Sequence, residues 1–117
     1  MHIHECMESS LPTCTPQDSL DTATVLLTES EHGAIAVVDP RGRLVGLVTP
    51  HDVSRTAAWL ERPLTAIPVA RAMRGVRSCY MAESVDTVRR LMDDEHVRLL
   101  PVVDADCRPI GTLAASA

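Results

Sequence analysis

The chain has 117 residues, of which 45% are hydrophobic, so it can build one core or two small packed cores but not two large domains. Its formal net charge of −5 argues against nucleic acid as a partner, because neutralising phosphates requires a basic face. No stretch approaches the roughly 18 uninterrupted apolar residues of a membrane span, and the N-terminus lacks a signal-peptide core, so we expect a soluble cytoplasmic protein without a membrane partner.

The first predicted elements are a helix and a hairpin. Ser19 or Asp18 can cap a helix over residues 20–30, whose apolar side chains recur on one face with the 3.6-residue period. Two apolar runs follow, at 34–38 and 44–48, and the Asp-Pro-Arg-Gly sequence between them is a strong turn signal. The order predicted for this region is therefore helix, strand, strand.

A second helix is predicted over residues 49–60. Thr49 can be its N-cap, Pro50 suits the first helical position, and Asp52 lies in the first turn, where a negative charge is favourable. This pattern fits simple capping, and it also fits a ligand site, because a helix N-terminus offers N–H groups to phosphate. Residues 63–68 are predicted to be an extended linker.

The chain repeats itself at an offset of 65 residues. Residues 14–52 align with residues 79–117 without a gap, and ten of those 39 positions are identical. The repeat predicts two copies of one unit, each with the order strand, helix, strand, strand, helix. The second copy stops after its hairpin, so we expect it to lack the last helix. The aligned pair Cys14 and Cys79 fits buried thiols better than a disulfide framework.

Residues 37–52 read Val-Val-Asp-x-x-Gly-Arg-Leu-Val-Gly-Leu-Val-Thr-x-x-Asp. Together with the Ser-Leu-Asp-Thr helix start, a leading x-x-x-Met and the tandem duplication, this segment resembles a pair of CBS domains, the Bateman module. The resemblance implies an α/β (α+β) fold of two β-α-β-β-α motifs with pseudo-twofold symmetry. The first motif is expected over residues 1–62 and the second, truncated motif over residues 69–117.

The resemblance implies a ligand sensor that is not a catalyst and requires no cofactor. Its ligand would be an adenosine compound, AMP, ADP, ATP or S-adenosylmethionine, held in a cleft between the motifs. It also implies a homodimer and an effector protein whose identity is unknown. By this resemblance Asp52 would accept the ribose hydroxyls, and Thr49 and His51 would donate to phosphate oxygens.

The other wall of that cleft is expected from the second copy. By resemblance Arg98 would lie near phosphate, with an exposed strand-edge arginine as the alternative interpretation. Val76 and Arg77, on the first strand of the second copy, would lie near the base, although Arg77 can equally be an exposed strand residue. Ala114 and Ala117 stand where the first copy has Thr49 and Asp52, which predicts at most one nucleotide per chain. The remaining expected ligand-binding residues are Val97, Leu99 and Pro101.

Two further hypotheses stay open at this point. The first is a ligand-free interaction or assembly module with decayed clefts. The second, weaker one is metal sensing, because His2, His4 and Cys6 would share one face of a strand and can bind Zn²⁺ or Cu²⁺. We expect no catalytic activity, because the chain has no glycine-rich phosphate loop and no His-Glu-x-x-His motif.

Overall fold

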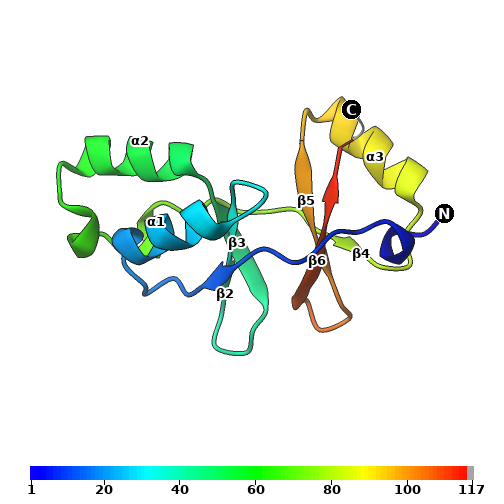
Figure 1. The fold of residues 1–117 in the computed structure, drawn as a ribbon, viewed down its shortest axis with the longest axis horizontal. Coiled ribbons are helices and arrows are strands. Elements are labelled where there is room, and N and C mark those ends of the chain that lie inside the picture. Colours follow the sequence, from blue (N-terminus) through cyan, green and yellow to red (C-terminus); the bar gives the residue numbers. More distant parts are fainter. Residues whose placement is uncertain (116–117) are drawn as a thin grey trace. The chain divides into compact units, whose positions relative to one another are not determined.

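The computed structural model describes residues 1–115, and they form two compact units, each with a three-stranded sheet (Figure 1). One unit is Leu11–Val76, and the other combines Met1–Ser10 with the described residues from Arg77 onward. Residues 1–10, which begin the first sequence repeat, therefore belong to the unit of the second repeat, and residues 69–76, which begin the second repeat, belong to the unit of the first. The predicted limits 1–62 and 69–117 describe the repeat in the sequence. Ala117, which entered the prediction about the second cleft, lies outside the described residues.

The unit Leu11–Val76 follows the order predicted for a CBS motif. Its sheet has the order β1-β2-β3, with β1 and β2 parallel and β2 and β3 antiparallel. Two α-helices and two short 3-10 helices complete the unit. Its elements are β1 (Thr13–Cys14), α1 (Leu20–Glu29), β2 (Ile35–Val38), β3 (Leu44–Val48), α2 (Pro50–Leu60), η2 (Leu64–Ala66) and η3 (Val69–Arg71).

The other unit repeats the same sheet with the order β4-β5-β6. Glu8 pairs with Thr112 of this sheet through two backbone hydrogen bonds, which explains why the first ten residues belong here. The mixed α/β class and the duplicated β-α-β-β order are thus confirmed. The elements are η1 (Ile3–Glu5), β4 (Cys79–Tyr80), α3 (Val85–Asp94), β5 (Leu99–Val103) and β6 (Pro109–Ala114).

The two hairpin turns use the same carboxylate device. Asp39 accepts hydrogen bonds from the backbone N–H groups of Arg41 and Arg43, each at 2.9 Å. Asp104 does the same in the second unit, so an aspartate that follows two valines fixes both turns. One residue of each turn has the left-handed backbone conformation, Gly42 in the first turn, at φ 81°, and Cys107 in the second, at φ 62°. Only the first turn therefore uses the residue that adopts this conformation without a steric cost.

Each unit has its own aliphatic core, as the near absence of aromatic residues requires. In the first unit α1 packs its buried stripe against the sheet and against the residues that follow α2. The buried core of this unit comprises Cys14, Leu20, Ala23, Leu27, Ile35, Val37, Val48, Val53, Ile67, Val69 and Ala72. The core of the second unit comprises Ile3, Cys79, Val85, Val88, Met92, Leu100, Val102 and Leu113.

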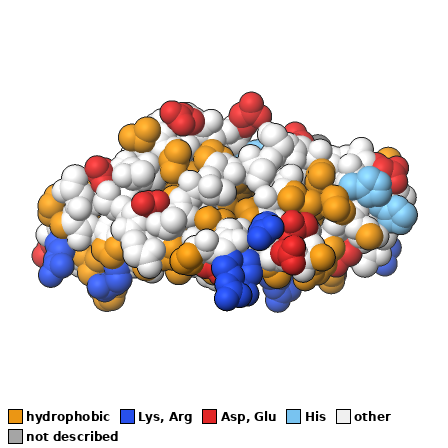
Figure 2. Space-filling model, turned by 90° about the horizontal axis from the view of Figure 1, so that it is seen from below, with side chains coloured by type: hydrophobic (Ala, Val, Ile, Leu, Met, Phe, Trp, Pro, Cys, Tyr) orange, Lys and Arg blue, Asp and Glu red, His pale blue; other side chains and the backbone are white. Residues whose placement is uncertain are grey.

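Some apolar side chains stay at the surface of both units. Trp59 on α2 is 77% exposed, and Leu91 on α3 is 54% exposed although its repeat partner Leu26 packs against the first core. Figure 2 shows hydrophobic side chains interspersed with arginines and acidic residues on one face of the molecule.

Two local predictions were wrong. Residues 63–68 are not fully extended, because they contain η2 and the buried side chain of Ile67, whose carbonyl accepts the Leu20 N–H. The alternation of His2, His4 and Cys6 on a strand is also wrong, because Ile3–Glu5 is a 3-10 helix that buries Ile3. The 3-10 helix buries Ile3 and leaves its neighbours His2 and His4 exposed, and the alternation of residue types along the sequence does not show this arrangement.

Candidate functional site

The start of α2 carries a reciprocal capping box built from Thr49 and Asp52. The Thr49 hydroxyl accepts the Asp52 backbone N–H at 3.3 Å, and the Asp52 carboxylate accepts the Thr49 N–H at 2.9 Å. The same hydroxyl also donates to Oδ2 of Asp52 at 2.9 Å. Because Pro50 supplies no N–H at the first helical position, this short sequence satisfies most of the donors that a helix start leaves unpaired.

The Asp52 side chain is fully buried and is held by two arginines. Arg74 donates from Nη2 to Oδ1 at 2.6 Å and from Nε to Oδ1 and Oδ2 at 3.1 and 3.3 Å. Arg55 approaches Oδ1 at 3.4 Å from the next turn of α2. The side chain of Asp52 has 0% exposure, whereas those of Arg74 and Arg55 are 54% and 62% exposed. The carboxylate therefore lies beneath a partly exposed pair of guanidinium groups.

Burial alone would raise the pKa of Asp52. The hydrogen bonds from Arg74 and Thr49, together with the charge of Arg74, outweigh burial and hold the pKa of this carboxyl below its ordinary value. Asp52 is therefore ionised at neutral pH, and it can act as a hydrogen-bond acceptor for hydroxyl groups or as a partner for a cation.

Arg74 reaches Asp52 because its backbone lies against β3. The N–H and carbonyl groups of Arg74 and Leu47 form two reciprocal hydrogen bonds of 3.1 Å. Gly46 permits this approach, since a Cβ there would lie 3.0 Å from the Arg74 carbonyl oxygen. Sequence reasoning did not identify Arg74, because it lies 22 residues from Asp52 and no local sequence pattern predicts a contact over that separation.

The predicted site residues of the first copy lie together. Thr49 and Asp52 share the capping box, and His51 lies between them with its side chain exposed. These three residues form one cluster at the start of α2, which was the position predicted for ribose and phosphate contacts.

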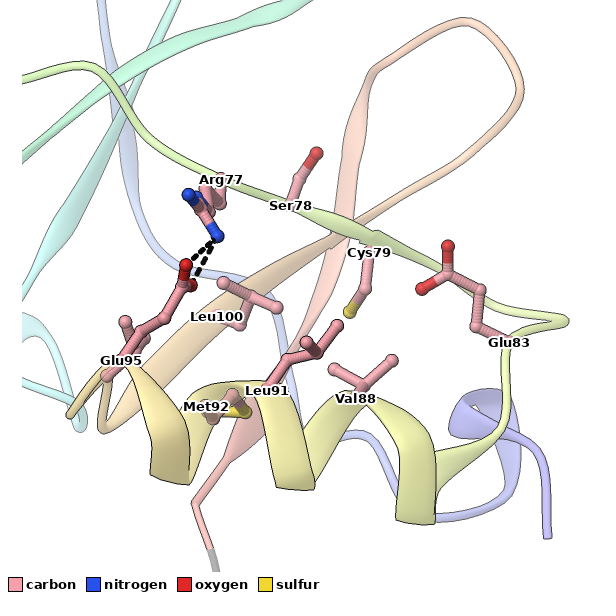
Figure 3. A pocket seen from close by; sticks show the side chains of 10 residues that line it. Arg77, Ser78, Cys79, Glu83, Val88, Leu91, Met92, Glu95 and Leu100 are labelled. Carbon is pink, nitrogen blue, oxygen red and sulfur yellow. Dashed lines mark hydrogen bonds and ion pairs between the residues drawn. The ribbon is translucent and has the colours of Figure 1, made fainter.

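In the second copy, two predicted residues share a pocket. Arg77 and Val97 line a pocket of about 170 Å³ between α3, β4 and the start of β5 (Figure 3). Its floor is apolar, and the ion pair between Arg77 and Glu95 lies at its edge. The volume is below the roughly 300–1,000 Å³ of ordinary small-molecule sites, so this pocket can hold only part of a ligand such as a nucleotide. The complete lining is Arg77, Ser78, Cys79, Glu83, Val88, Leu91, Met92, Glu95, Val97 and Leu100.

The other predicted residues of the second copy lie on or beside the sheet. Leu99 and Pro101 belong to β5, and the Arg98 carbonyl accepts the Ala115 N–H at 2.9 Å. The placement of Val76 and Arg77 on a strand was wrong, because β4 begins only at Cys79. The strand consists of the two residues that pair with β5, Cys79 with Val102 and Tyr80 with Val103.

The N-terminal histidines do not form a metal centre with Cys6. The rings of His2 and His4 stack with their centroids 5.7 Å apart, and His2 lies 3.6 Å from the Glu5 carboxylate. Within residues 1–115 there is no group of three or more His, Cys, Asp or Glu side chains that could hold a metal ion.

Comparisons with known proteins agree with this architecture. A sequence model of the CBS domain matches residues 3–58. The solved structure of a protein with CBS domains from Burkholderia ambifaria is 32% identical, and the match covers 89% of this chain and 76% of that one, with a TM-score of 0.74. The chain belongs to the CBS-domain family.

Other relatives of this CBS-domain chain include a protein solved with a bound nucleotide and a much longer curated protein. CBSX2, a CBS-pair protein from Arabidopsis thaliana, has been solved in complex with AMP; it is 27% identical over 97% of this chain and 89% of that one, with a TM-score of 0.81. The chain spans only about a fifth of the curated homoserine O-acetyltransferase of Methanohalobium evestigatum, to which it is 26% identical over 97% of its own length and 22% of that protein. Among the described residues, no helix is long and apolar enough to cross a bilayer.

Proposed function

We propose that this CBS-domain chain is a non-catalytic regulatory module that binds an adenosine compound, AMP, ADP, ATP or S-adenosylmethionine, and thereby alters its docking to an effector protein. The observation that carries the proposal is the ionised carboxylate of Asp52 at the start of α2, next to Thr49. A carboxylate can accept both vicinal ribose hydroxyls, and the helix start favours a phosphate nearby. The AMP complex of CBSX2 supports an adenosine ligand for this family.

The ligand contacts of the proposal are those predicted from the sequence. Thr49, His51 and Asp52 would contact ribose and phosphate, and Arg98 would contact phosphate. Arg77 would lie near the base. The proposed apolar surroundings of the ligand are Val76, Val97, Leu99 and Pro101.

Isothermal titration with AMP, ATP and S-adenosylmethionine tests this function. We expect saturable binding with close to one ligand per chain and its loss in Asp52→Ala. Asp106→Ala is the matched control, because Asp106 is an exposed aspartate in the β5–β6 turn, remote in sequence from α2. Absence of both heat and thermal stabilisation at millimolar concentrations of all three ligands would refute the proposal.

A ligand-free interaction module is the second candidate function, and one observation favours it. The Asp52 carboxylate already receives hydrogen bonds from Thr49, Arg55 and Arg74, so it is fully used as a structural group. In that case Asp52→Ala would destabilise the protein, and no adenosine compound would bind to the wild type. We propose a homodimer under either function, which sedimentation velocity of the wild-type chain would measure.

A further inference from the structure

We infer that Arg74 determines which adenosine compounds bind, by competing with ribose for Asp52 and then pairing with a phosphate of the ligand. The inference rests on the proposed function, since it assumes that Asp52 is the ribose acceptor. It identifies the ligand class as phosphate-bearing adenosine compounds, with adenosine itself, which carries no anionic group, as a poor ligand.

The first step of the argument is the hydrogen-bonding capacity of the carboxylate. Two carboxylate oxygens offer about four acceptor positions. Thr49 fills two of these positions on Oδ2 with its N–H and its hydroxyl. Arg74 fills positions on Oδ1 with its Nε and Nη2 donors. Ribose hydroxyls can therefore reach Asp52 only where one of these donors has left.

Arg74 is the donor that can leave. The Thr49 N–H is fixed by the helix start, whereas the Arg74 side chain is 54% exposed and can extend into water. Arg55 is more exposed, but its single contact of 3.4 Å is too weak to block the carboxylate. The buried Asp52 side chain, with 0% exposure, becomes accessible when the Arg74 guanidinium moves.

The released guanidinium must stay near the carboxylate. The backbone of Arg74 is held on β3 by the two reciprocal hydrogen bonds with Leu47, so only its side-chain torsions can change. A ligand bound at Asp52 would therefore have a guanidinium within reach. A phosphate on that ligand restores the lost ion pair with bidentate, charge-assisted hydrogen bonds, whereas adenosine, which carries no anionic group, leaves Arg74 without a partner.

The second unit offers an internal comparison. Its Glu8 forms the same reciprocal backbone pair with Thr112 that Arg74 forms with Leu47. The corresponding position of the second unit thus carries a carboxylate, and in the sequence Ala117 aligns with Asp52. At these two aligned positions the sequence therefore combines an aspartate with an arginine in the first repeat and an alanine with a glutamate in the second.

Titration of the full chain with AMP, adenosine and S-adenosylmethionine tests the inference. We expect the wild type to prefer AMP over adenosine by about 10- to 100-fold, the range that a charge-assisted hydrogen bond supplies. In Arg74→Met, adenosine should bind more tightly than it binds the wild type and AMP more weakly, so the ratio of AMP to adenosine affinity should fall at least about tenfold, to the value that the remaining phosphate contacts supply. Arg74→Lys should give an intermediate ratio, because it keeps the charge without the bidentate geometry.

Arg71→Met is the matched control, because Arg71 is an exposed arginine in the same segment and is not among the hydrogen-bond and ion-pair partners of Asp52, which are Thr49, Arg55 and Arg74. The ratio of AMP to adenosine affinity in this variant should equal that of the wild type. An unchanged ratio of AMP to adenosine affinity in Arg74→Met would overturn the inference and leave the proposed function standing. If neither the wild type nor Arg74→Met binds any of the three compounds, and the wild type does not bind ATP either, the proposed function fails and the inference fails with it.

Discussion

Replacing Asp52 by Asn tests whether the charge of this buried carboxylate stabilises the fold. The amide is nearly the same shape, but it has a single acceptor oxygen. If that oxygen faces Arg74, the amide N–H₂ group faces the Thr49 N–H, and a backbone donor loses its partner. An unsatisfied buried donor costs about 1–3 kcal/mol, and weakening the ion pair with the half-exposed Arg74 adds up to about 1 kcal/mol. We expect Asp52→Asn to lower the free energy of unfolding by about 1–4 kcal/mol at pH 7.

The pH dependence of this difference gives a second readout. The pKa of Asp52 is lower in the folded protein than its ordinary value of 3.8, so the charged group stabilises the fold at every pH above that value. As the pH falls from 3.8 through the folded-state pKa, this stabilisation is lost in the wild type but not in Asp52→Asn. The difference in stability between the two proteins should therefore shrink in acid.

Urea denaturation of both proteins between pH 3 and pH 7 measures these two effects. Asp106→Asn, at an exposed turn position, is the control and should change stability by no more than about 0.5 kcal/mol. A difference between wild type and Asp52→Asn below about 1 kcal/mol at pH 7, or one that does not fall in acid, would refute the structural role assigned to the Asp52 charge.

Three further predictions concern packing, thiols and a surface ion pair. Gly46→Ala should lower the free energy of unfolding, measured by urea denaturation, by about 1–3 kcal/mol, because its Cβ would lie 3.0 Å from the Arg74 carbonyl oxygen. The Cβ of Gly75→Ala would meet no atom within 4 Å, so this variant should be neutral or stabilising, and equal effects of the two substitutions would contradict the packing argument. Burial raises the pKa of Cys79 to about 11, so its thiol should react with a disulfide reagent at pH 8 only after unfolding, while the exposed Cys107 reacts in the native protein. Because Cys6 is only partly buried, the test uses a variant in which both Cys6 and Cys107 are replaced by Ser, and rapid labelling of that variant would argue against this assignment. Glu95→Gln, which removes the acidic partner of the ion pair with Arg77, should lower the free energy of unfolding by less than about 1 kcal/mol. A larger loss would mean that the pair is more than a surface contact.

The hairpins and the α2 cap could be predicted from the sequence because their causes are local. Asp39 accepts hydrogen bonds from residues two and four positions later, and Thr49 and Asp52 pair within one helical turn. A chain segment carries all the atoms that such contacts need, so its sequence pattern determines the geometry. The repeat likewise predicted the duplicated sheet, because the same pattern at an offset of 65 forms the same elements.

The sequence by itself thus determined the family, the order of elements and the residues at the start of α2. Only the tertiary structure decided that Arg74 covers Asp52 and that Glu8, from the first ten residues, pairs with the sheet of the second repeat. These contacts join residues 22 and about 100 positions apart, and they depend on how β3 and β6 present their edges to other segments. Side-chain spacing records helix and strand periods, but it carries no signal for which distant segment reaches a given edge.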